Sequence, residues 1–165
     1  MRKIRTYGEP ILRKKAEEVK DIDDKTLKLI NSMKETLLKA QGIGLAGPQV
    51  GVSKRIFITY DKEKENFITL INPVILEKNG YEIDIEGCLS FPEIFFSINR
   101  AKKVIVKGIN EKGKEIIVEA NGIIARCFQH EIDHLNGILI IDYATQNEKN
   151  FYKEKLEHLL QKSKK

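Results

Sequence analysis

The sequence has little cysteine, no apolar run of membrane-spanning length, and no apolar segment behind its basic start. Its 165 residues include only two cysteines, Cys88 and Cys127, in different sequence settings. A helix that crosses a bilayer needs about 20 consecutive apolar residues, and a secretory signal needs an apolar core that the segment after Met1 lacks. These absences exclude a secreted disulfide mini-protein and an integral membrane protein. We therefore expect a reducing, cytoplasmic location, where cysteines pack, bind metal or react.

The chain also lacks internal repeats, linkers rich in proline or serine, and low-complexity tracts before its last few residues. Its length suffices for a buried core but is too short for two ordinary domains, which predicts a single domain over 1–165. The 29 Lys and Arg residues exceed the 24 Asp and Glu residues by five. This mild positive charge is compatible with an anionic partner and is weak evidence for one.

The spacing of apolar residues predicts helices at both ends of the chain and between them a run of strands followed by a further helix. A spacing of three to four predicts helices over 23–40, 122–136 and 147–165. Short segments rich in Ile and Val predict strands at 55–60, 67–72, 74–77, 81–85, 103–109 and 114–120, the last two forming a hairpin. The glycine-rich stretch 41–51 predicts an irregular loop. This order indicates an α+β fold rather than alternating βαβ units.

The helix over 122–136 carries two faces that both require cover. One face, within about 60° at a turn of about 100° per residue, carries Ile123, Cys127, His130 and His134. The adjoining face carries Ile124, Phe128 and Leu135. We therefore expect a central buried helix with antiparallel or mixed β-sheets packed around it.

The strongest chemical signal is the segment His130–His134, with the sequence HEIDH. Histidines at i and i+4 lie about 40° apart around a helix and about 6 Å apart along it, so both imidazoles can reach one metal ion. Glu131 projects beside them, where a carboxylate can accept a proton from water. The alternative is a pair of histidines that merely pack in the core. The chain has only three histidines, and two of them on a buried helix face favour the metal site.

A metal held by two histidines requires a third protein ligand, and the sequence offers two sources. The longer zinc-protease pattern requires a histidine where this chain has Ile140, which excludes that pattern. Glu154 and Glu157 follow downstream, but they lie on a lysine-flanked segment typical of a solvated helix face. Cys88 lies upstream in the short stretch EGCLS, and a thiolate is a good ligand for first-row metals. We favour Cys88 and expect Cys127 to pack in the wall of the site.

Three segments together resemble the peptide deformylase family in their order and spacing: Gly42–Gln49, Glu86–Ser90 and Gln129–His134. The strand pattern and the length are also similar to those of the family. Gly47 differs, since the family usually has alanine there, and this difference removes no functional group. The helical tail is similar to the family branch that ends in a C-terminal helix.

The resemblance implies a hydrolase that removes the formyl group from N-formyl-methionine of nascent polypeptides and releases formate. It implies one Fe²⁺ per chain, for which Zn²⁺, Ni²⁺ or Co²⁺ can substitute, with Cys88, His130 and His134 as ligands. Because a ferrous ion beside a thiolate is readily oxidised, we expect the activity to be lost in air.

The resemblance also assigns roles to other residues of the site. Glu131 would act first as general base and then as general acid. The side-chain amide of Gln49 and the backbone N–H of Leu89 would stabilise the oxyanion of the tetrahedral intermediate. Gly44 would allow close approach of the peptide main chain, as the family's pairing of this loop with the peptide implies.

Neighbouring residues supply the pocket and its support. Ile43, Ile123 and Cys127 are expected walls for the methionine side chain, because they are apolar and adjacent to the metal ligands. Arg126 is expected at the rim of the pocket or facing solvent. Asp133 and Glu86 are candidates to accept hydrogen bonds from the liganding histidines, and Arg100 is a candidate partner of Glu86. Surface salt bridges are the alternative for these charged residues.

Two other functions and one further partner remain open from the sequence. A zincin-type metallopeptidase would require a ligand downstream of His134. A non-enzymatic binding module would require a closed site with four protein ligands. In 147–165, six lysines against three glutamates suggest that the tail contacts the ribosome, where phosphate is abundant, and a solvated helix is the alternative. We expect no membrane partner and no specific binding of DNA.

Overall fold

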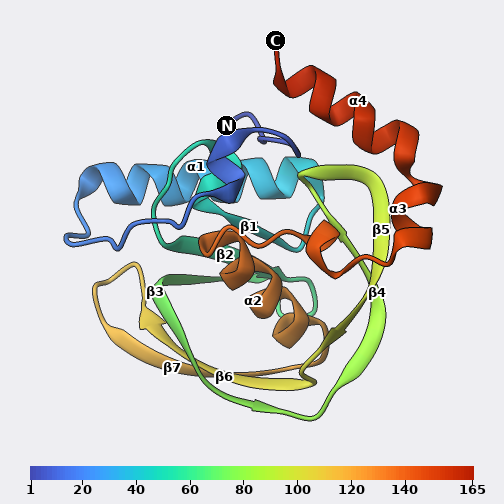
Figure 1. Cartoon of the computed structure of the whole chain (residues 1–165). Coiled ribbons are helices and arrows are strands. Elements are labelled where there is room, and N and C mark those ends of the chain that lie inside the picture. The colour runs from blue at the N-terminus through green and yellow to red at the C-terminus, as the bar shows by residue number, and fades with distance from the viewer.

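The computed structural model describes residues 1–165 as two antiparallel sheets and four α-helices (Figure 1). The helices are α1 (Asp24–Ala40), α2 (Gly122–Leu135), α3 (Gln146–Phe151) and α4 (Lys153–Ser163). The strands are β1 (Gly44–Ala46), β2 (Ile56–Asp61), β3 (Asn66–Asn79), β4 (Glu82–Cys88), β5 (Phe91–Arg100), β6 (Lys103–Ile109) and β7 (Glu115–Asn121). Short 3₁₀ turns, η1 (Pro10–Arg13), η2 (Gly47–Val50) and η3 (Ile140–Tyr143), connect them. None of the helices combines the length and the apolar character that crossing a membrane requires.

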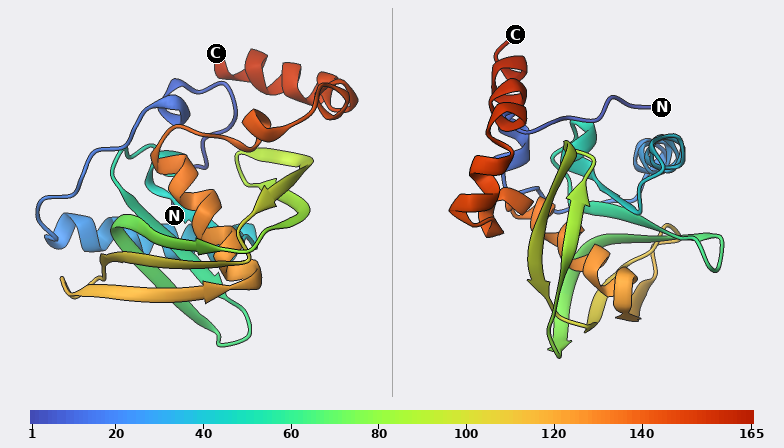
Figure 2. Two further views of the ribbon diagram at one scale, coloured as in Figure 1. Left: turned by 60° about the horizontal axis from the view of Figure 1, so that its bottom comes forward. Right: turned by 90° about the vertical axis from the view of Figure 1, so that its right-hand side faces the viewer.

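The strands form two separate sheets around α2, which confirms the predicted α+β class. The larger sheet has the order β1-β2-β3-β6-β7, and β4 pairs only with β5. The hairpin of β6 and β7 is as predicted. Figures 1 and 2 show α2 in the interior, with the larger sheet on one side and the β4–β5 hairpin on another. Phe128 and Leu135 of α2 are fully buried in one core cluster with Phe57 and Leu70 of the larger sheet.

The observed elements differ from the predicted ones in four places. The strand predicted over 81–85 is β4, which continues through Cys88. The segments 67–72 and 74–77 form the single strand β3, which continues through Pro73 because the register shifts there and Asn72 adopts a left-handed φ of 52°. The loop predicted over 41–51 contains β1 and the turn η2. The strand β5 was not predicted, although its buried residues Ile94, Phe96 and Ile98 alternate with exposed ones.

The tail predicted as one helix over 147–165 is two helices. Thr145 caps α3 with its side chain, and α3 ends at Phe151, immediately before Tyr152. Leu156 and Leu159 of α4 are buried in one cluster with residues of β5. Phe151, predicted in the apolar stripe of the tail, is 81% exposed. The apolar stripe therefore consists of the two leucines of α4 that pack against β5.

The chain leaves α2 through a tight turn at Gly137, two residues after the last helical residue, Leu135. Gly137 has a φ of +73°, and a Cβ atom there would lie 2.5 Å from the backbone oxygen of Arg13. The Arg13 guanidinium donates a 3.1 Å hydrogen bond to the Gly137 oxygen and two to the Asp142 carboxylate. Both the backbone conformation and the close approach therefore require glycine.

We predict that Gly137→Ala lowers the free energy of unfolding by about 2–4 kcal/mol, because a left-handed alanine costs roughly 1–2 kcal/mol and the clash with Arg13 adds to it. Gly113→Ala is the matched control, since Gly113 also has a positive φ, of +79°, but a Cβ there meets nothing within 4 Å. Urea denaturation of the two variants measures the difference. Equal losses in both variants would contradict the close approach at Gly137.

Candidate metal centre

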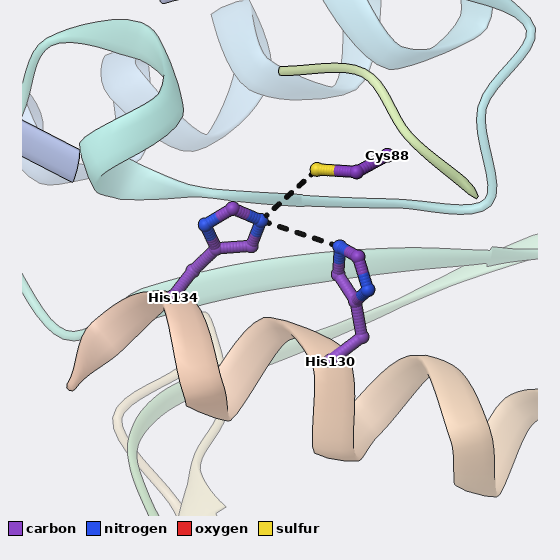
Figure 3. Close-up of side chains that lie close together, drawn as sticks. All are labelled: Cys88, His130 and His134. Carbon is purple, nitrogen blue, oxygen red and sulfur yellow. Dashed lines mark hydrogen bonds between the residues drawn. The ribbon is translucent and has the colours of Figure 1, made fainter. Parts of the chain in front are cut away.

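The three predicted metal ligands, Cys88, His130 and His134, lie together in the interior, where β4 ends beside α2. The Sγ atom of Cys88 is 3.3 Å from Nε2 of His134, and the two Nε2 atoms of His134 and His130 are 3.2 Å apart. All three ligand atoms lie within 4.8 Å of one another. Figure 3 shows the three side chains converging, Cys88 from the strand and both histidines from the same face of the helix.

These distances fit a single shared ion. In a tetrahedral site with ordinary zinc–ligand lengths, two imidazole nitrogens lie about 3.4 Å apart and a thiolate sulfur lies about 3.6 Å from a nitrogen. The observed separations of 3.2 Å and 3.3 Å are close to these values. One thiolate and two imidazoles suit a divalent first-row metal, and three protein ligands leave one position for substrate or water. Both cysteines are free, so no disulfide competes for Cys88.

The electrostatic field of the cluster also favours a cation between the ligands. Burial lowers the pKa of His130, but the negative charges of Cys88 and Glu131 outweigh burial and raise the pKa well above its usual value. Burial lowers the pKa of His134, and the neighbouring His130 lowers it further, so this imidazole is neutral. A field that attracts a proton to His130 attracts a metal cation to the same place.

The buried carboxylate of Glu86 holds the ring of His130. The Nδ1 atom of His130 lies 2.6 Å from Oε2 of Glu86, which leaves Nε2 free to face Cys88 and His134. Arg100 donates to both oxygens of Glu86, at 3.1 and 2.7 Å. Burial raises the pKa of Glu86, but His130 and Arg100 outweigh it and lower the pKa to about 2. The carboxylate is therefore ionised at neutral pH.

Asp133 belongs to the same charged cluster but contacts neither histidine by a hydrogen bond. Its Oδ2 accepts hydrogen bonds of 2.6 Å from Arg100 and 2.6 Å from the hydroxyl of Tyr143. Asp133 therefore acts one step away, by fixing Arg100. The Nδ1 atom of His134 is buried and has no hydrogen-bond partner in the protein. Of the two carboxylates predicted to hold the histidines, Glu86 makes the contact directly.

Glu131 lies beside the three ligands with one oxygen unengaged. Its Oε1 is buried and has no hydrogen-bond partner in the protein. Its Oε2 lies 4.0 Å from Nε2 of His130 and 3.9 Å from Sγ of Cys127. Burial raises the pKa of Glu131 to about 7. A carboxyl group near neutral pKa can both accept and return a proton.

Gln49 reaches the cluster from the turn η2. Its Nε2 lies 3.6 Å from the Cys88 sulfur and 3.1 Å from the hydroxyl of Ser90, and its Oε1 accepts a hydrogen bond from the backbone of Ala46. Ser90 in turn donates a 2.7 Å hydrogen bond to the backbone oxygen of Arg5. Sequence reasoning did not assign a role to Ser90, although it is the last residue of the EGCLS stretch. The structure shows that Ser90 fixes the orientation of the Gln49 amide.

A cavity of about 560 Å³ opens onto the cluster. It is lined by five of the predicted site residues, Ile43, Gly44, Leu89, Ile123 and Cys127, whereas Gln49 does not line it. A Cβ on Gly44 would lie 2.5 Å from both the Cys127 sulfur and Oε2 of Glu131, so a side chain there would fill the space beside the cluster.

One part of the cavity wall differs from the sequence expectations, because it comes from the unpredicted strand β5, through Phe91, Ile94 and Phe95. Arg126 lines the cavity, in agreement with the first of its two expected places, and its side chain, which is only 13% exposed, reaches Glu86 rather than solvent. The apolar residues Ile94, Phe96 and Ile98, two positions apart, were the signal in the sequence for β5 and for its part of the cavity wall.

The alternative ligands Glu154 and Glu157 lie on α4, and neither belongs to the group of residues that could hold the metal. α4 packs instead through Leu156 and Leu159. The arrangement of the ligands therefore gives no support to a zincin-type site.

Known proteins are similar to this chain in both sequence and structure. The sequence model of the polypeptide deformylase family matches residues 1–150. A peptide deformylase of Halothermothrix orenii is 55% identical over 139 residues, 84% of this chain and 90% of that protein. A peptide deformylase of Carboxydothermus hydrogenoformans is 49% identical over 142 residues, which cover 86% of this chain and 92% of that protein.

Solved structures agree with the sequence relatives. The crystal structure of peptide deformylase from Thermus thermophilus superposes with a TM-score of 0.93 at 34% identity and covers 99% of each chain. That from Thermotoga maritima gives a TM-score of 0.83 at 46% identity, over 88% of this chain and 98% of that one. The chain therefore belongs to the peptide deformylase family of metalloenzymes, which remove the N-formyl group from nascent peptides.

Proposed function

We propose that Cys88, His130 and His134 hold the catalytic metal with which this chain deformylates formyl-methionyl nascent peptides. The observation that carries the proposal is the convergence of these three ligands beside the carboxylate of Glu131, where Cys88, His130 and Glu131 line one cavity. We assign the activity to one domain over residues 1–165. A reducing cytoplasm is the location that suits it, because a thiolate ligand must stay reduced to bind metal.

Fe²⁺ is the metal that we propose, with Zn²⁺, Ni²⁺ or Co²⁺ as substitutes and one ion per chain. The three donors suit all four ions, and the choice of iron rests on the resemblance to the family. When bound, the ion supplies Lewis acidity, which lowers the pKa of water and polarises the formyl carbonyl.

Glu131 moves the proton. Its unengaged oxygen accepts a proton from the attacking water, and the same carboxyl group then donates that proton to the departing amine. A pKa near 7 makes both transfers accessible to one group. The free oxygen supports this role, because no donor in the protein forms a hydrogen bond to it.

Gln49 and Leu89 stabilise the developing negative charge on the formyl oxygen. The Gln49 amide is held within 3.6 Å of the Cys88 sulfur, next to where the carbonyl would bind. The backbone N–H of Leu89 follows Cys88 directly and donates to no backbone acceptor. Two preorganised donors at this place suit an oxyanion, and losing one such donor typically costs about 10² to 10³ in rate.

The loop at Ile43 and Gly44 and the start of α2 bind the substrate. Gly44 leaves room for the peptide main chain beside Glu131. Ile43, Ile123 and Cys127 line the cavity and provide apolar surface for the methionine side chain. Ile123 is 62% exposed, which places it at the mouth of the cavity.

We predict that Glu131→Gln lowers kcat for formate release by at least about 10²-fold and keeps the metal, because the amide cannot accept the proton. Formate released from a formyl-methionyl peptide measures this, with the unformylated peptide as the blank. Cys88→Ser is the companion variant, and it should lose the metal itself, as metal analysis would show. Full activity of Glu131→Gln, or a Cys88→Ser variant with one firmly bound ion, would contradict the assigned roles.

We predict that the iron-loaded enzyme loses activity in air whereas the nickel-loaded enzyme keeps it. Fe²⁺ and its thiolate ligand are open to oxidation, and Ni²⁺ is not readily oxidised under the same conditions. Anaerobic purification, loading with either metal and timed exposure to air, with formate release as the readout, provides the comparison. Equal decay of the two forms would show that the metal does not determine the sensitivity to oxygen.

We also propose that the basic tail contacts the ribosome. The segment 147–165 contains six lysines and three glutamates. Of the lysines, Lys153, Lys162, Lys164 and Lys165 are exposed. Leu156 and Leu159 attach α4 to the rest of the protein, which leaves these lysines available to ribosomal phosphates.

We predict that changing these four lysines to glutamine weakens co-sedimentation with ribosomes and leaves peptide deformylation unchanged. These substitutions spare the buried leucines, which truncation after Thr145 would remove. They also spare Lys155, which lies 3.5 Å from the carboxylate of Glu93 at the cavity. The measurement is sedimentation at low and at raised salt, since phosphate contacts weaken as salt rises. Binding equal to wild type at low salt would remove the proposal.

A further inference from the structure

The metal ligands come from two elements that no sheet hydrogen bonds join. Cys88 is the last residue of β4, and both histidines belong to α2. β4 pairs only with β5, and this hairpin is not part of the larger sheet. Side-chain contacts between the helix and the hairpin therefore help to set the distance between the cysteine and the histidines before any metal binds.

Arg126 of α2 makes three hydrogen bonds to that hairpin. Its Nη2 donates to the backbone oxygen of Glu82 at 2.7 Å, and its Nη1 donates to the backbone oxygen of Ile98 at 2.9 Å. Nη1 also lies 3.2 Å from Oε1 of Glu86. The side chain is 13% exposed. One arginine of the helix thus binds both strands of the hairpin and the carboxylate that holds His130.

The position of these contacts matters more than their number. Glu82 begins β4 and Cys88 ends it, so the two residues lie about 20 Å apart along the strand. The end of the hairpin near Cys88 has other contacts, since the backbone N–H of Tyr7 donates to the oxygen of Ser90 at 3.0 Å. The bonds of Arg126 to Glu82 and Ile98 hold the strands farther from Cys88 against α2, so that the helix contacts the hairpin along its length.

Arg126 and Arg100 bind the two elements in opposite directions. Arg100 projects from β5 to Asp133 on α2, at 2.6 Å. Arg126 projects from α2 to the hairpin. Both guanidinium groups meet at the Glu86 carboxylate, each in contact with its Oε1. A planar group with several fixed donors suits such bridging, and a lysine cannot reproduce it.

We propose that Arg126 is a positioning residue, which holds the β4–β5 hairpin against α2 so that Cys88 meets His130 and His134 in metal-binding geometry. The inference rests on the proposed metal site and goes beyond it, because it assigns metal retention to a residue that provides no ligand.

If Arg126 acted through its charge alone, its removal would strengthen metal binding rather than weaken it. The centre already holds the acidic side chains of Glu86, Glu131 and Asp133, beside the thiol of Cys88. Removing a positive charge from this neighbourhood makes it more negative, which strengthens the attraction for a divalent cation. Loss of positioning weakens metal binding instead. The direction of the effect therefore separates the two roles.

The test compares Arg126→Gln, which removes the charge, with Arg126→Lys, which keeps it. We expect both variants, loaded with one Ni²⁺ per chain, to release nickel to a chromogenic chelator at least about tenfold faster than wild type, in the range that residues behind metal ligands usually show. Arg126→Lys should release nickel more slowly than Arg126→Gln, because a lysine can still donate to one of the acceptors. Amide hydrogen exchange of the metal-free variants should rise in residues 82–87.

Arg13→Gln is the matched control. Arg13 also donates to a backbone oxygen and to a carboxylate, those of Gly137 and Asp142, but it does not contact the hairpin. We expect this variant to lower thermal stability and to release nickel at the wild-type rate. Release that is unchanged or slower in Arg126→Gln, or lysine behaviour identical to wild type, would overturn the proposal. A wild-type chain that binds no nickel would overturn the proposed metal site itself, and absence of formate from nickel-loaded wild type would overturn only the activity.

Discussion

The arrangement of the metal centre depends on one buried ion-paired carboxylate. Glu86 accepts from His130 at 2.6 Å and from Arg100 at 2.7 Å, and Arg126 approaches its other oxygen. A buried carboxylate without such partners would cost several kcal/mol. The pairing therefore does two things at once, since it keeps Glu86 ionised and fixes the tautomer of His130 with Nε2 toward the other ligands. Cys88, Glu131 and Gln49 are arranged around the position that this contact defines.

Burial shifts the pKa of Glu131, the neighbouring carboxyl group, in the direction opposite to the shift of Glu86. Glu86 has a pKa of about 2 because cationic partners outweigh burial, whereas burial raises the pKa of Glu131 to about 7. Two carboxyl groups in the same site thus differ in charge because of their environments, with Glu86 an anion at neutral pH and Glu131 near the pKa that its proposed role as proton carrier requires. The two cysteines divide in the same way. Cys88 is placed to bind metal, whereas burial raises the pKa of Cys127, so it stays a neutral wall of the cavity.

The sequence predicted what local geometry determines and missed what depends on distant partners. His130 and His134 follow from helix spacing alone, and the burial of α2 follows from its two apolar faces. Cys88 is 46 residues from His134, so local spacing could not identify it; the ligand chemistry of a thiolate favoured it, and the family resemblance then implied the same residue. The strand β5 escaped detection because Pro92 lies near its start, and proline is uncommon inside strands. The role of Arg126 could not be inferred, because its acceptors lie on strands that only the folded chain brings to the helix.

The central claim, one ion held by one sulfur and two imidazole nitrogens, is tested most directly by X-ray absorption at the nickel edge of the nickel-loaded protein. The account predicts one sulfur and two imidazole scatterers per nickel, in the wild type and equally in Cys127→Ser, because only Cys88 belongs to the ligand group. A first shell without sulfur, or a sulfur contribution that disappears in Cys127→Ser, would contradict it.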